Sequence, residues 1–169
     1  VSDTRFNPLG EPVELFDRIK AAEFPVIDPL AGEQMGNIIR EAKADADSVG
    51  GTIECMVTGL PAGIGDPMFG GLENIISSAV FAVPAIKGIE FGNGFACAEL
   101  RGSENNDPYY YTEDGSIRTA TNNHGGILGG ISSGMPLLFR VAVKPTPSIG
   151  KEQQSISFSE QKAASRRCP

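Results

Sequence analysis

The chain has 169 residues, 40% of them hydrophobic, and a formal net charge of −7. This length fits one domain or part of a larger one, and the hydrophobic content suffices for a core. The acidic balance argues against a general nucleic-acid binder, which needs a basic face, and no apolar run approaches the length of a membrane span. A local anion site stays compatible with the charge, because nearby groups set the potential of a pocket.

The cysteine and histidine content argues against a metal site or disulfides. Cys55, Cys97 and Cys168 are far apart, no C-x-x-C pair occurs, and His124 is the only histidine. The first dozen residues are polar and interrupted by proline, which is not typical of a signal peptide. We therefore expect a cytoplasmic protein with reduced thiols and no bound metal.

Three segments have the apolar spacing of amphipathic helices. Residues 13–24 place Leu15, Phe16 and Ile19 on one face, before Pro25. Residues 33–46 and 72–83 keep the i, i+3, i+4, i+7 spacing, and Pro84 ends the latter. Residues 26–32 are expected to form a turn.

Other segments alternate as strands do. In 52–60, Ile53, Cys55 and Val57 share one face, and in 137–143 the odd-numbered positions form one apolar row. Segments 86–91 and 95–100 flank Gly92-Asn93-Gly94, a strong turn signal, and 155–158 is a further short strand. The order of helices and strands predicts an α/β or α+β domain.

No linker or internal repeat divides the chain, so we expect a single domain over 1–169. Residues 103–121 are polar and are predicted to form an exposed loop, and 159–169 a flexible tail. Three consecutive tyrosines at 109–111 either tether that loop locally or lie at a subunit contact.

The segment 122–150 is the most informative part of the chain. Four glycines within six residues (125, 126, 129 and 130) allow close backbone approaches, and bare N–H groups in such a loop can cradle an anion. Lys144 follows at the end of a strand, on the same face as Arg140 and beside Thr146 and Ser148. The pattern indicates a pocket for a phosphate-bearing ligand; the alternative is a glycine-rich turn without a ligand.

Common site motifs do not fit. Gly63-Ile64-Gly65 lacks the third glycine of a dinucleotide fingerprint, and the glycines at 125 and 130 are followed by Ile131 and Ser132 rather than the Lys and Ser/Thr of a P-loop. His124 has no obvious carboxylate partner in the sequence, so a solvated or ligand-adjacent histidine is favoured over a catalytic one. The stretch 104–107 could ligate a metal through oxygen, but a solvated polar loop is the favoured interpretation.

Several motifs in one order resemble the chorismate synthase family between about residues 33 and 149. They are Asp47-Ser48-Val49-Gly50-Gly51, Gly59-x-Pro61-x-Gly63-x-Gly65-x-Pro67, Pro84-Ala85-Ile86-Lys87-Gly88, Gly102-Ser103-Glu104-x-x-Asp107, the glycine loop 122–134 and Lys144-Pro145-Thr146. The resemblance implies an α+β fold with β-α-β sandwich-like layers and a mixed or antiparallel sheet. It also implies a homotetramer that converts 5-enolpyruvylshikimate 3-phosphate to chorismate and phosphate, a 1,4-elimination requiring reduced FMN, in aromatic amino acid biosynthesis.

The resemblance also implies which residues contact the flavin, and we expect Gly129 and Lys144 to line one cavity. The flavin-binding positions it assigns are Ala85, Gly129, Lys144, Pro145, Thr146, Pro147 and Ser148. The small phosphorylated substrate is the expected partner, with neither nucleic acid nor membrane.

The family's two acid/base histidines, its arginines that hold substrate and its Arg-Ser-Ser flavin segment are not present here. No catalytic residue is therefore assigned, and the role of His124 is not transferred from the family. The alternative to an active enzyme is a non-catalytic fragment that only binds a ligand or a partner subunit. If further segments supply central strands, this piece exposes apolar surface or associates to cover it.

Overall fold

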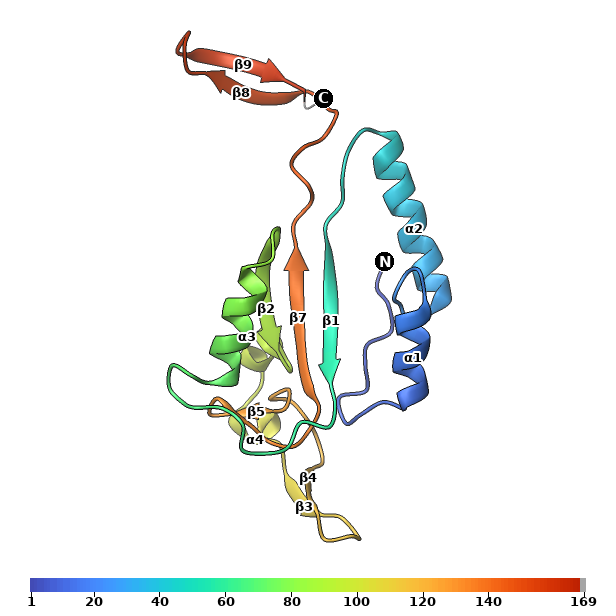
Figure 1. The fold of residues 1–169 in the computed structure, drawn as a ribbon, viewed down its shortest axis with the longest axis vertical. Coiled ribbons are helices and arrows are strands. Elements are labelled where there is room, and N and C mark those ends of the chain that lie inside the picture. The colour runs from blue at the N-terminus through green and yellow to red at the C-terminus, as the bar shows by residue number, and fades with distance from the viewer. Residues whose placement is uncertain (168–169) are drawn as a thin grey trace.

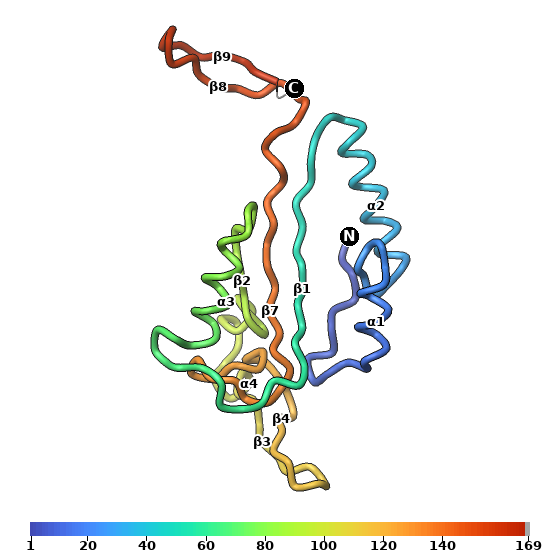
Figure 2. Tube along the Cα trace, in the orientation of Figure 1, coloured from blue at the N-terminus to red at the C-terminus, as the bar shows by residue number. Residues whose placement is uncertain are grey.

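A three-stranded antiparallel sheet is the centre of the computed structural model, which describes residues 1–167 (Figure 1). Its middle strand is β7 (Leu137–Val143), with β1 (Gly51–Val57) on one edge and β2 (Ile86–Phe91) on the other. The molecule is elongated along β7, and the tube in Figure 2 shows the chain leaving the sheet at both ends of that strand. The segments before and after β7 therefore lie at opposite ends of the sheet.

The helices lie to either side of the sheet. The helix α3 (Leu72–Phe81) lies beside β2, whereas α1 (Val13–Ala21) and α2 (Pro29–Ala44) lie beyond β1 (Figure 1). The prediction of a helix over 33–46 was right in type but late in its start. Asp28 accepts the Leu30 N–H at 2.9 Å and Pro29 occupies the first turn, so the segment predicted as a turn begins α2.

The strands predicted over 52–60, 86–91 and 137–143 are present as β1, β2 and β7, although β1 ends earlier, at Val57. Ile53 pairs with Val141 and Cys55 with Phe139, so the two apolar rows meet on one face. Phe91 of β2 joins them, its ring centroid 5.8 Å from that of Phe139.

The opposite face of the sheet carries a row of charges. Arg140 lies between Glu54 and Glu90, one from each neighbouring strand, and its guanidinium contacts Glu90 directly. The N-terminal segment covers this row, because Phe6 donates its N–H to Glu54 at 2.8 Å. Arg140 is therefore paired with carboxylates of this protein. Lys144, which lies on the same face, is not paired with a carboxylate within residues 1–167, and can interact with an external anion.

The predicted strand 95–100 is wrong: the structure has a 3-10 helix, η1 (Gly94–Glu99), in its place. Asn93 donates its N–H to the Asn123 carbonyl, and Phe95 donates its N–H to the Glu90 carboxylate. These bonds turn the chain away from β2 before a hairpin partner can form.

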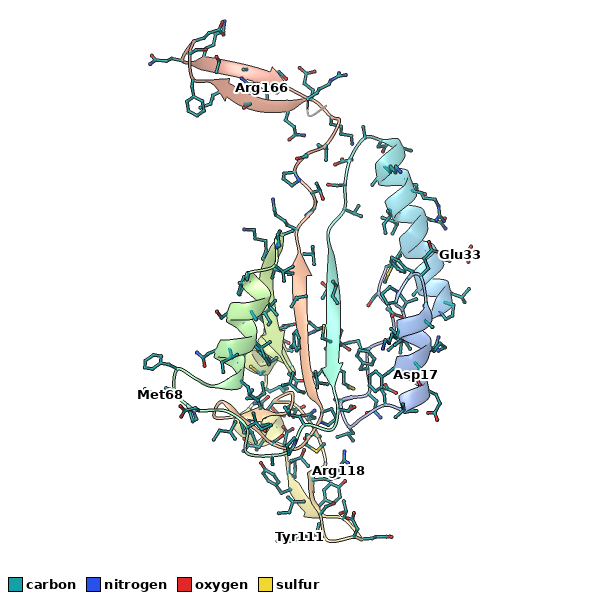
Figure 3. The ribbon with its side chains drawn as sticks, in the orientation of Figure 1. Asp17, Glu33, Met68, Tyr111, Arg118 and Arg166 are labelled. Atoms are coloured by element: carbon teal, nitrogen blue, oxygen red, sulfur yellow. The ribbon has the colours of Figure 1, made fainter. Side chains whose placement is uncertain are left out.

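The segments 103–121 and 159–169, predicted as an exposed loop and a flexible tail, both contribute strands to hairpins. Within 103–121 lie most of α4 (Gly102–Asn105) and the strands β3 (Tyr109–Tyr111) and β4 (Ile117–Thr119), and the side chain of Tyr111 extends from the hairpin in Figure 3. Within 159–167, β9 (Lys162–Arg166) pairs with β8 (Gln153–Ser157), where the shorter strand 155–158 was predicted. Cys168 lies outside the described residues, and Cys55 and Cys97 are free thiols.

Apolar side chains remain exposed over much of the surface. Ile53 on the apolar face of the sheet is 54% exposed, and Phe69 and Met68 in the loop before α3 are more open still. Figure 3 shows Met68 extending from that loop away from the rest of the chain. Exposed apolar surface of this extent is unusual for a monomeric domain. No helix within residues 1–167 has the length and hydrophobicity needed to cross a bilayer.

Candidate functional site

The candidate site begins where β7 ends. Lys144 is the first residue after that strand, and its N–H donates to the carbonyl of Ala85 at 2.9 Å. Ala85 lies in the turn between α3 and β2, with a φ of +73° that alanine rarely adopts. Two predicted flavin contacts that lie far apart in sequence are thus joined by a hydrogen bond, one of them in a strained backbone conformation of the kind that is concentrated at functional sites.

The segment after β7, residues 144–148, has hydrogen-bond donors without an intrachain acceptor within residues 1–167. Pro145 and Pro147 have no N–H, while those of Ile149 and Gly150 donate to Pro147 and Ala46. In the described part of the chain, no intrachain hydrogen bond uses the N–H or hydroxyl groups of Thr146 and Ser148, or the ammonium of Lys144. Two N–H groups, two hydroxyls and one cation are the donors that a phosphate group takes up.

The loop 46–50, between α2 and β1, lies against this segment. Ser48 Oγ donates to the Thr146 carbonyl at 2.7 Å, and Lys151 Nζ lies 2.7 Å from the Asp47 carboxylate. The hydrogen bond from Lys151 holds the pKa of Asp47 below its usual range, and the same bond raises the pKa of Lys151. Both side chains are well exposed, so the pair orients the segment more than it stabilises the fold.

Gly129 lies at the other end of β7. It sits in the tight turn between β5 (Ile127–Leu128) and β6 (Ile131–Ser132), and its neighbour Gly130 accepts the Leu72 N–H at the start of α3. The expectation that Gly129 and Lys144 line one cavity is not met within one copy of the chain. The β5–β6 turn packs near the start of β7 and Lys144 follows its end, which separates them by about 20 Å at the usual rise per residue.

Two shallow pockets within residues 1–167 are lined by residues other than the predicted site residues. One is lined by the β8–β9 hairpin, from Ile156 to Ala163, and the other by α1, α2 and the turn between them, from Arg18 to Glu33. Residues 145–148 are exposed, so the candidate site is an exposed strand end.

Sequence reasoning missed the partner of His124. The Asp107 side chain is only 4% exposed, and its oxygen Oδ2 lies 3.1 Å from His124 Nδ1. The same carboxylate accepts the N–H groups of Asn123 and His124 and the hydroxyl of Thr121. The stretch 104–107 is therefore not merely a solvated polar loop: its aspartate is buried and holds the start of the glycine loop.

We expect Asp107→Ala to destabilise the fold by roughly 2 kcal/mol, because buried N–H donors lose their acceptor. The matched control is Asp17→Ala, which removes an exposed carboxylate from α1 and is expected to cost no more than about 0.5 kcal/mol. Urea unfolding of the full-length protein measures both; equal effects would show that the Asp107 carboxylate does not hold the loop.

The fold defines an α+β protein whose central strand ends in a segment with hydrogen-bond donors that are unused within residues 1–167. The family model for chorismate synthase matches residues 7–168, a wider span than the motifs alone covered. The chain belongs to the chorismate synthase family.

Individual relatives agree with this membership. A chorismate synthase of Lancefieldella parvula is 47% identical over 94% of this chain and 44% of its own length, and one of Dehalococcoides mccartyi is 53% identical over 78% and 36%. A crystal structure of a chorismate synthase superposes with a TM-score of 0.71 at 32% identity, covering 78% of this chain and 40% of that one, which confirms the α+β fold. The chain spans less than half the length of these relatives.

Proposed function

We propose that this chain is part of an enzyme that converts 5-enolpyruvylshikimate 3-phosphate to chorismate and phosphate by 1,4-elimination, with reduced FMN as cofactor. Membership of the family supports the reaction. The observation that carries the cofactor proposal is the set of unused donors on Lys144, Thr146 and Ser148 beside the strained Ala85.

The residues present fit a flavin phosphate. The ammonium of Lys144 supplies positive charge, and the N–H and hydroxyl groups of Thr146 and Ser148 supply directional donors. Pro145 and Pro147 keep the backbone between these donors extended and limit its torsional freedom. When bound, reduced FMN supplies the electron chemistry of the elimination, and the protein orients it and excludes water.

In this proposal, Gly129 contacts a flavin other than the one bound at Lys144 of the same chain. Its exposed position at the far end of β7 lets it approach a flavin held mainly by other segments, either of the rest of the enzyme or of another copy. An added Cβ at Gly129 meets no atom within 4 Å, so this chain leaves the space beside it open.

We also propose that the enzyme is a cytoplasmic homotetramer in which other protein segments cover the exposed apolar side chains. Sedimentation of the full-length protein at the mass of four chains supports this assembly, and a monomer at micromolar concentration contradicts it.

Phosphate release tests the reaction. With 5-enolpyruvylshikimate 3-phosphate and photoreduced FMN, we expect the full-length protein to release phosphate and form chorismate. Failure to release phosphate, with FMN fluorescence still quenched, would favour the alternative of a piece that binds ligand without turning it over. Loss of both signals would overturn the proposal.

A further inference from the structure

The motif Asp47–Gly51 has no role in the function proposed above. The structure places it against the candidate flavin segment, Lys144–Ser148. Residues 46–50 leave α2 and enter β1 beside the chain that leaves β7 (Figure 1). Ser48 Oγ donates to the Thr146 carbonyl across a sequence separation of 98 residues, and the Gly150 N–H donates to the Ala46 carbonyl at 3.0 Å. Lys151 and Asp47 add an ion pair between the same two segments.

The bond from Ser48 acts on the conformational freedom that the prolines leave in the segment. Proline fixes φ at 145 and 147, and a residue before proline is restricted to extended conformations, which limits Lys144 and Thr146. Within that extended range, the peptide between Thr146 and Pro147 can still rotate by some tens of degrees with ψ of Thr146. A hydrogen bond to the Thr146 carbonyl fixes that peptide, and with it the place of Ser148 relative to Lys144.

Gly50 lets the two segments lie this close. A Cβ at Gly50 would lie 2.5 Å from the Val143 carbonyl oxygen and 2.9 Å from Pro145 Cδ, and neither atom can move freely. A Cβ at the adjacent Gly51 would meet nothing within 4 Å. The two glycines of the motif therefore differ: the first is required by the contact with the flavin segment, and the second is not.

We propose that the loop Asp47–Gly51 preorganises the segment Lys144–Ser148 for the phosphate of its ligand, with Ser48 as a positioning residue that does not touch the ligand. This inference rests on the proposed function, because it assumes that Lys144–Ser148 binds FMN. Preorganisation raises affinity by lowering the ordering cost of binding, so its loss weakens binding of the phosphate and leaves the rest of the flavin contact unchanged.

The experiment compares FMN with riboflavin, which lacks the phosphate, by fluorescence quenching in the full-length protein. We expect Ser48→Ala to weaken FMN binding by about three- to tenfold, the effect of one hydrogen bond, and to leave riboflavin binding unchanged. Ser48→Thr keeps a hydroxyl and is expected to restore most of the affinity. Gly50→Ala is expected to reduce the preference for FMN by at least as much, whereas Gly51→Ala retains it.

The outcomes separate this inference from the proposed function. Equal losses for FMN and riboflavin in Ser48→Ala, or no loss for either, overturn the positioning role of Ser48. If Lys144→Ala weakens FMN binding while Ser48→Ala does not, the flavin segment is right and only the role of the loop is wrong. If neither variant changes FMN binding, the proposed site itself fails.

Discussion

Gly125→Ala is expected to destabilise the fold by about 4 kcal/mol, a large part of the stability of a domain of this size. Gly125 has a φ of +64°, and a Cβ added there would lie 2.4 Å from the Gly92 nitrogen and 2.7 Å from the Leu138 carbonyl oxygen. All the crowded atoms belong to the backbone, so no side chain can turn aside. The left-handed conformation costs about 1–2 kcal/mol for alanine and the overpacking about 1–3 more.

The contact matters because it joins the glycine loop to the sheet. The Gly92 N–H donates to the Leu138 carbonyl, and the Leu138 N–H donates to the Gly125 carbonyl. A Cβ at Gly125 would crowd both the Gly92 nitrogen and the Leu138 carbonyl oxygen, the donor and the acceptor of the first of these bonds. The loop 122–134 thus has a structural role, because it packs against the start of β7.

Gly115→Ala is the matched control for this prediction. Gly115 also has a positive φ, +81°, but lies at the tip of the β3–β4 hairpin with nothing within 4 Å of an added Cβ. We expect it to cost about 1 kcal/mol, the conformational cost alone. Urea unfolding of the full-length protein measures both variants, and a Gly125→Ala loss no larger than that of Gly115→Ala would mean that the backbone contact is not tight.

Patterns of side chains predicted the sheet well because strand alternation is a local property. The rows of 52–60 and 137–143 meet in the register that their apolar positions require. The start of α2 is also visible in the sequence as Asp28-Pro29, an N-cap followed by a first-turn proline, within the segment 26–32 that is predicted as a turn. By contrast, Phe95 follows an Asn-Gly pair that is typical of hairpins, and the bonds to the distant Asn123 and to Glu90 turn the chain into η1 instead.

The candidate site was predictable only in part for the same reason. The prolines and hydroxyls after Lys144 are visible in sequence, but the hydrogen bond from Lys144 to Ala85 needs the pairing of β2 with β7. The contact of Asp107 with His124 needs the β3–β4 hairpin, which brings together residues 17 positions apart. Nor does any local pattern reveal that Arg140 is taken up by Glu54 and Glu90, which removes it as an anion ligand.

Lys144→Ala is expected to weaken FMN binding by roughly 10- to 100-fold, the effect of losing one charge-assisted hydrogen bond to a phosphate. With Arg140 held by two carboxylates, Lys144 is the cation that β7 delivers to the strand end, and its backbone stays anchored to Ala85 after the substitution. Because the anchor is kept, we expect folding stability to change by no more than about 0.5 kcal/mol. Fluorescence titration of the full-length protein with FMN measures the affinity.

Lys43→Ala removes the same charge from the exposed last turn of α2 and controls for the change in net charge. The effect of Lys144 on FMN affinity should weaken as salt rises, because added free ions screen the attraction between an exposed ammonium and a phosphate. If both variants lose the same FMN affinity, the effect comes from the net charge of the protein rather than from the position of Lys144. An unchanged affinity in Lys144→Ala would instead remove the cation from the flavin site and leave the donors of Thr146 and Ser148 without the charge that makes them a phosphate site.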